Sequence, residues 1–103
     1  MADKSIERIL GMLQGFLERP LEYVQPVEIP TVEAFLYGVR ASCRFCGVSS
    51  DLFKAMESRG WEPLAASIEP QCRAAGMDDA AIIQELIALE LDAFRWATQT
   101  SAE

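Results

Sequence analysis

Cys43 and Cys46 form a Cys-x-x-Cys pair, a pattern that can bind a metal ion or exchange a disulfide. A structural zinc site uses four sulfur or nitrogen ligands. The sequence contains no histidine, and its only other thiol is Cys72. A zinc site on these three cysteines would therefore need a carboxylate or a second chain to complete it. Metal binding at Cys43, Cys46 and Cys72 is kept as an alternative.

Thiol redox chemistry makes a different demand on the same pair. A reactive thiolate is usually stabilised by the positive N-terminal end of a helix. The pair falls at the C-terminal end of a helix predicted over residues 31–46, where the helix dipole opposes a thiolate. Arg44 would offset only part of this effect. The position of the pair therefore disfavours a redox function, which is kept as an alternative.

The spacing of the two cysteines fits a buried helix face better. Apolar side chains recur at steps of four, three, four and three residues, in the order Val32, Leu36, Val39, Cys43 and Cys46. Both thiols are therefore predicted to be small buried groups of the core. The opposite side of the helix should face solvent and carries Glu33, Tyr37, Arg40 and Arg44.

Glu90 is the second unusual residue, because it falls in the middle of the apolar arc of the last predicted helix. A buried carboxylate is costly unless it is paired or protonated. We expect Glu90 to pair with an arginine beneath a loop, or to lie on a more exposed rim. The alternative is a functional carboxylate with a raised pKa.

The first third of the chain predicts a helix followed by a proline-rich segment. Apolar residues at three- and four-residue steps favour an amphipathic helix over residues 5–19, which Pro20 should end. Gly11 and Gly15 lie on its polar side, where each costs about 1 kcal/mol relative to alanine. We expect this cost to be tolerated, although close packing against that side would also explain the two glycines. Residues 20–30 contain three prolines and should form an extended strap.

The remaining elements are also predicted to be helical. Thr31 should cap the second helix and Gly47 should close it in the left-handed conformation. A third helix is expected over residues 52–60. Residues 61–76 should form two short helices or one kinked helix that begins with Trp61-Glu62-Pro63, with Pro63 in the first turn. The last helix should follow a cap at Asp78. The prediction is an all-α bundle of five or six short helices, with residues 1–103 as a single domain.

Composition excludes several functional classes. The 103 residues hold 16 acidic and 9 basic side chains, a net charge of −7, and the basic ones are scattered, which argues against nucleic-acid binding. Without histidine there is no Ser-His or Cys-His pair, and the glycines form no phosphate-binding loop. The charged N-terminus and the lack of a long apolar run argue against secretion and membrane insertion. We expect a cytoplasmic protein that is not an enzyme and has no cofactor.

Protein binding is the remaining class with support from the sequence. The candidate contact residues are the aromatic side chains Tyr37, Trp61 and Trp96 together with the acidic residues Glu33 and Glu62. The negative charge would favour a basic partner, bound through an acidic face. A helical homodimer with a structural or scaffolding role, formed through the apolar face of residues 82–97, is the further alternative.

Residues 19–24 followed by residues 32–38, and Gly76-Met77 leading into residues 82–90, are reminiscent of small bacterial proteins, some of them immunity-like. With its small size, acidity and helical organisation, the chain resembles the immunity proteins that bacteria produce together with toxins. Such proteins bind a toxin and block its active site. The resemblance implies an inhibitor that acts by binding, and it assigns no functional residues.

Overall fold

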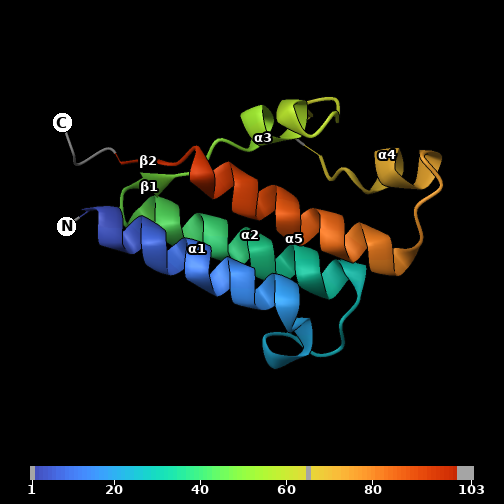
Figure 1. The fold of residues 1–103 in the computed structure, drawn as a ribbon, viewed down its shortest axis with the longest axis horizontal. Coiled ribbons are helices and arrows are strands. Elements are labelled where there is room, and N and C mark those ends of the chain that lie inside the picture. The colour runs from blue at the N-terminus through green and yellow to red at the C-terminus, as the bar shows by residue number, and fades with distance from the viewer. Residues whose placement is uncertain (1, 65, 100–103) are drawn as a thin grey trace.

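Three long helices lie side by side and form the body of the protein (Figure 1). The computed structural model describes residues 2–64 and 66–99. The long helices are α1 (Ala2–Glu18), α2 (Ile29–Phe45) and α5 (Asp79–Arg95), and α5 packs against both others. α1 runs opposite to α2 and α5. In the described part of the chain, no helix combines the length and apolar character needed to cross a membrane.

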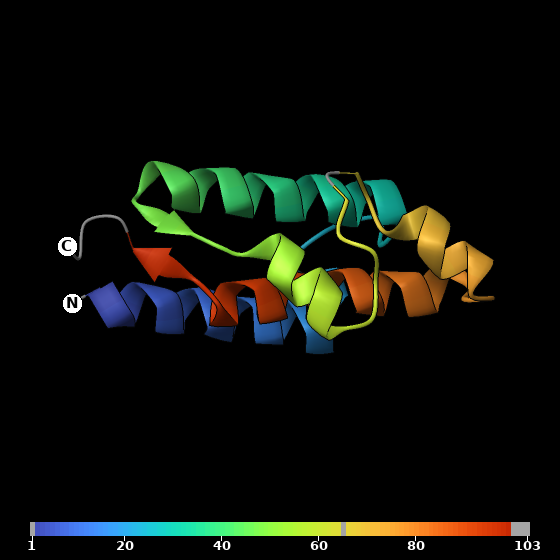
Figure 2. The ribbon, with the colours of Figure 1, turned by 90° about the horizontal axis from the view of Figure 1, so that it is seen from above.

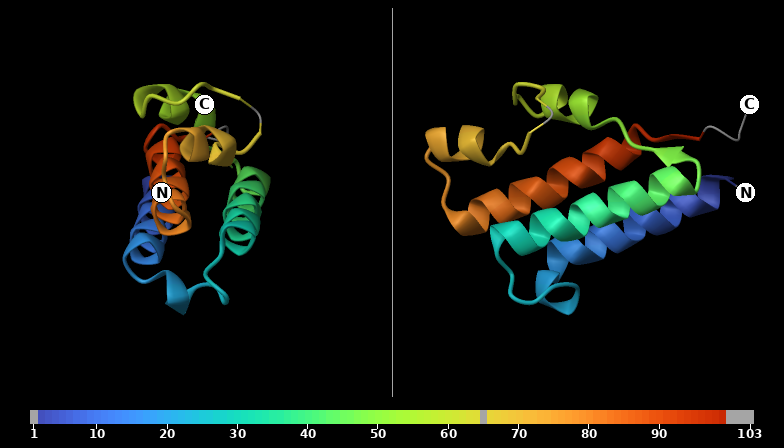
Figure 3. Two further views of the ribbon diagram at one scale, coloured as in Figure 1. Left: turned by 90° about the vertical axis from the view of Figure 1, so that its right-hand side faces the viewer. Right: turned by 180° about the vertical axis from the view of Figure 1, so that it is seen from behind.

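Two shorter helices cover α5 on a second side (Figures 2 and 3). They are α3 (Leu52–Ser58) and α4 (Glu69–Ala74), and a 3-10 turn, η1 (Pro20–Glu22), follows α1. Two short strands, β1 (Val48–Ser49) and β2 (Thr98–Gln99), pair antiparallel and were not predicted. Each of the other four α-helices of the described chain contacts α5, so the five form one bundle. The predicted all-α bundle is confirmed.

The apolar arc of α5 lies inside the protein and not on its surface. Nine side chains of this helix are buried: Ile82, Ile83, Leu86, Ile87, Leu89, Glu90, Leu91, Ala93 and Phe94. The eight apolar ones join one cluster with side chains such as Phe16 of α1, Val32 of α2 and Met56 of α3. The face predicted for a homodimer is therefore already occupied by the chain's own helices.

The boundaries of the first two helices differ from the prediction at the prolines. α2 begins at Ile29 instead of Thr31, and Pro30 lies in its first turn. The N–H groups of a first turn have no partner within the helix, so proline loses no hydrogen bond there. Glu28 therefore holds the cap position predicted for Thr31. The strap is shorter than predicted, because residues 20–22 form the 3-10 turn and Ile29 is already helical and buried.

The helix predicted to begin with Trp61-Glu62-Pro63 does not form there. Residues 61–64 and 66–68 are not helical, and α4 begins at Glu69 with Pro70 in its first turn. Gln71 explains the open segment, because its side chain accepts from the Glu62 N–H at 2.9 Å and donates to the Glu62 carbonyl at 3.0 Å. A side chain of α4 thus supplies the backbone hydrogen bonds that a helix at Glu62 would otherwise have made.

Gly15 is explained by close packing and not by a tolerated cost. A Cβ at this position would lie 2.5 Å from the hydroxyl oxygen of Tyr23, whose ring packs 5.4 Å from that of Phe16. Gly11 has no such neighbour within 4 Å, so its cost is simply tolerated. Gly47 closes α2 with a φ of 85°, as predicted.

Candidate binding surface on α2

α2 presents an uncharged surface on the side that faces away from the core. At about 100° per residue, this outer face is the 140° arc opposite the buried Val32 and Leu36. Beyond the first turn of α2, it consists of Ala34, Tyr37, Gly38, Ala41, Ser42 and Phe45. Phe45 is 93% exposed and Tyr37 is 68% exposed. Solvent-exposed aromatic side chains on one uncharged helix face are typical of a surface that a partner covers.

Phe45 was missed at the level of sequence, although a signal was present. The predicted core seam consists of Val32, Leu36, Val39, Cys43 and Cys46, and the predicted solvent-facing side consists of Glu33, Tyr37, Arg40 and Arg44. A helical wheel of α2 places Phe45 with Ala34, Gly38 and Ala41, opposite that seam. The charges occupy only one flank of the helix, not its whole outer side.

The charged flank of α2 joins it to α5 through Arg40. Arg40 donates from Nε to Oε2 of Glu90 at 3.0 Å and from a terminal nitrogen to Oε1 at 2.6 Å. The Glu90 side chain is only 2% exposed and that of Arg40 is 25% exposed. The hydrogen bonds to Glu90 raise the pKa of the Arg40 guanidinium, which therefore stays charged. The predicted arginine pairing of Glu90 is confirmed, and Arg40 is not simply a solvent-facing residue.

A cavity of about 210 Å³ lies beside this ion pair, between α2, α3, α5 and residues 66–68. Its walls are mostly apolar, from Leu36, Leu52, Met56, Ile68, Leu86, Leu89 and Ala66. Its polar groups come from Glu33, Tyr37, Arg40, Ser67 and Glu90. Glu33 accepts a hydrogen bond from the hydroxyl of Ser67 and makes no ion pair with a described residue.

The other flank of α2 borders an open groove of about 500 Å³ toward α1. Its lining is apolar or small, with Met12 from α1 and Ala34, Phe35, Gly38, Val39, Ser42 and Cys43 from α2. The ring of Phe35 packs against that of Phe16, with their centroids 4.9 Å apart, on the core side of the groove. The uncharged surface therefore continues from the outer face of α2 into this groove.

The three cysteines do not form a site. Cys72 is fully buried, Cys43 is half-buried, and Cys46, which follows the last residue of α2, is exposed. The prediction that Cys46 is buried is wrong, because the helix ends before it. Burial and the neighbouring Cys46 raise the pKa of the Cys43 thiol. Among the described residues, no three cysteine, aspartate or glutamate side chains are placed to hold a metal ion.

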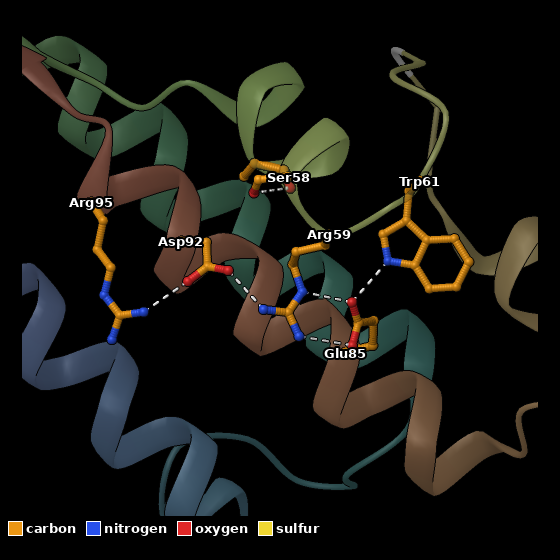
Figure 4. A network of polar contacts seen from close by, with 7 residues as sticks. Ser58, Arg59, Trp61, Glu85, Asp92 and Arg95 are labelled. Carbon is orange, nitrogen blue, oxygen red and sulfur yellow. Dashed lines mark hydrogen bonds and ion pairs between the residues drawn. The ribbon is translucent and has the colours of Figure 1, made fainter.

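Trp61 has a structural role that the sequence did not reveal. Its indole N–H donates to Glu85 at 2.8 Å, and Glu85 also accepts from Arg59 at 2.7 and 3.0 Å (Figure 4). Arg59 donates further to Asp92, which is bound by Arg95. These contacts tie the end of α3 to α5. Trp61 is half-buried within this network.

Trp96 and Glu62 lie apart from the outer face of α2. Trp96 follows α5, is 46% exposed and has the ammonium of Lys54 4.3 Å from its ring centroid. It borders a separate hollow with Ser58, Asp92 and Arg95. Glu62 is exposed in the segment after α3. Of the five predicted contact residues, the structure brings together Tyr37, on the outer face of α2, and Glu33, on its charged flank beside the cavity.

Comparison with known proteins gives no family. No protein-family model, curated protein or solved structure matched this chain.

Proposed function

We propose that this protein is a non-enzymatic protein-binding module whose partner covers the outer face of α2. The observation that carries the proposal is the exposure of Phe45 and Tyr37 on one uncharged side of a helix whose opposite side is buried. An exposed apolar surface of this kind carries a free-energy cost in water that is relieved when a partner covers it. The groove toward α1 extends the same surface and gives a partner helix or loop room to lie against α2.

The partner in this proposal is a basic protein with an apolar contact region. The chain carries a net charge of −7, which attracts a basic partner and opposes pairing with a second copy of itself. Seven described acidic side chains form ion pairs with arginines, namely Glu18, Glu22, Glu69, Asp79, Glu85, Glu90 and Asp92. The acidic side chains therefore contribute through their summed charge, which attracts a basic partner, whereas the outer face of α2 makes the direct contact. An inhibitor of the bacterial immunity type, acting in the cytoplasm, fits this description.

The proposal is tested by comparing three forms of the protein. The wild type, the double variant Tyr37→Ser/Phe45→Ser and the control Leu21→Ser are used to capture partners from the native cell. Leu21 is a matched control because it is 61% exposed but lies in η1 and outside the outer face. The captured protein is then purified, and its affinity for each form is measured by calorimetry.

We expect a basic partner that binds the wild type and Leu21→Ser alike. Loss of buried aromatic contacts should weaken the double variant at least about 30-fold. Equal binding of all three forms would overturn the assignment to α2. A concentration-dependent dimer in sedimentation, abolished by Tyr37→Ser/Phe45→Ser, would instead identify a second copy as the occupant.

A further inference from the structure

We infer that the cavity beside the Arg40–Glu90 pair is a binding site for an ammonium group carried on a short apolar stem. This inference does not depend on the identity of a partner protein. It follows from the size of the cavity, from its apolar walls and from an excess of negative charge among its lining residues.

Size limits the occupant to a small group. Pockets for drug-sized ligands have volumes of about 300–1,000 Å³, whereas a cavity of about 150 Å³ accepts a molecule the size of benzene. At about 210 Å³, the cavity between α2, α3 and α5 admits a chain of a few carbon atoms with one polar head. Its walls favour a stem without polar atoms, because Leu52, Met56 and Ile68 offer no hydrogen bonds.

The charges around the cavity select the head group. Three ionisable side chains among the lining residues carry formal charges: Glu33 and Glu90 are acidic and Arg40 is basic. Arg40 is committed to Glu90 by two hydrogen bonds, so no described residue supplies a cation to the carboxylate of Glu33. An anionic ligand would face this uncompensated carboxylate. A cationic ligand would neutralise it.

Tyr37 adds a second favourable contact for a cation. Its side chain lines the same cavity as Glu33, one helical turn away on α2, and is 68% exposed. Aromatic rings attract ammonium groups through their electron-rich faces. The hydroxyl of Ser67 holds Glu33 from the opposite wall and so fixes the carboxylate that would receive the cation.

Two sources can supply this chemistry, a free small amine or a lysine side chain of a bound protein. Binding of n-pentylammonium, 1-pentanol and pentanoate is measured by NMR titration of the backbone amides. We expect saturable shifts at Glu33, Tyr37 and Ser67 with n-pentylammonium, at least tenfold weaker binding of 1-pentanol, and no binding of pentanoate. Equal or stronger binding of 1-pentanol or pentanoate would overturn the inference.

Two matched variants test the role of the carboxylate. Glu33→Gln keeps the size of the side chain and should weaken n-pentylammonium binding about fivefold. Glu57→Gln, an exposed change on α3 away from the cavity lining, should leave it unchanged. Equal losses in both variants, or none in Glu33→Gln, would contradict a specific site. N-acetyl-lysine-N-methylamide distinguishes the sources, since binding as tight as that of n-pentylammonium indicates a lysine of a protein, and weaker binding indicates a free amine.

Discussion

The guanidinium of Arg40 forms two hydrogen bonds with the carboxylate of Glu90, fifty residues away in the sequence, and thereby links α2 to α5. Both oxygens of Glu90 accept one hydrogen bond each, at 3.0 and 2.6 Å. Both residues line the small cavity, and Arg40 lies on the charged flank of α2. The ion pair therefore holds in place the helix on which both proposed binding features depend.

Removing Arg40 should destabilise the protein more than its partly exposed position suggests. Arg40→Met would leave the Glu90 carboxylate buried without a partner, and we expect a loss of about 3 kcal/mol in the free energy of unfolding. Arg44→Met, which changes an exposed arginine one turn further along α2, should cost less than about 0.5 kcal/mol. Urea denaturation of the two variants provides the measurement.

A double variant separates the loss of the Arg40–Glu90 attraction from the cost of burying the Glu90 carboxylate without a partner. Arg40→Met/Glu90→Leu removes both partners, so it should be more stable than Arg40→Met alone. If the double variant is instead the less stable of the two, the ion pair does not account for the loss.

Gly11 and Gly15 should respond in opposite directions to the same substitution. Gly11→Ala should stabilise the protein by about 0.5–1 kcal/mol, because nothing lies within 4 Å of the new methyl group. Gly15→Ala should destabilise it by about 1 kcal/mol, since the methyl group would overlap the Tyr23 hydroxyl. Thermal unfolding checks both. Adding Tyr23→Phe should relieve the defect of Gly15→Ala, and a lack of relief would refute the steric explanation.

Glu85 should make stability depend on pH. Hydrogen bonds from Arg59, and to a lesser extent from Trp61, hold the pKa of the Glu85 carboxyl below its ordinary value of 4.5. A folded-state pKa below the unfolded one stabilises the protein at pH values above the unfolded pKa. This contribution is lost as pH falls below about 4.5 and through the folded-state pKa.

Glu85→Gln should therefore cost about 2 kcal/mol at pH 7, and the difference from the wild type should narrow in acid. Chemical denaturation at pH 7 and at pH 3.5 measures the two differences. Glu57→Gln alters an exposed carboxylate without a hydrogen bond to a described residue and serves as the control. A gap that widens in acid would contradict the assigned direction of the pKa shift.

The three thiols should differ in their rates of alkylation. Cys46 is exposed and should react first, whereas Cys43 is slowed by half-burial and by the pKa that burial raises. Cys72 is fully buried and should react only when the protein opens. Mass spectrometry after short iodoacetamide treatment should find one modified thiol in the wild type. The same modification should be absent in Cys46→Ser, and rapid labelling of Cys72 would contradict its burial.

Local signals in the sequence were sufficient for several elements. The predicted cap at Asp78 accepts a hydrogen bond from the backbone N–H of Ala81, and Gly47 adopts the predicted left-handed conformation. These features depend on residues within one turn of each other, so the sequence contains all their parts. The boundary at Pro30 was missed because a proline after a strap and a proline in a first turn look alike in sequence.

The candidate site was predicted only in part. Tyr37 was identified by its residue type and its helical phase, but Phe45 was assigned to no face and Cys46 was assigned to the core. Whether a residue in the last turn is buried depends on what packs against that end of the helix. Trp61 is half-buried and its indole donates to Glu85, a residue 24 positions away, so its neighbours in the sequence could not reveal this contact.

The sequence by itself determined that this protein is helical, acidic and built around an apolar last helix, because periodicity, capping and charge are properties of neighbouring residues. Only the tertiary structure decided which arginine neutralises Glu90, why position 15 must be glycine, and that α2 leaves an aromatic face uncovered. Each of these depends on two segments meeting in space. The free energy of such a meeting comes from packing and desolvation, which no single stretch of sequence contains.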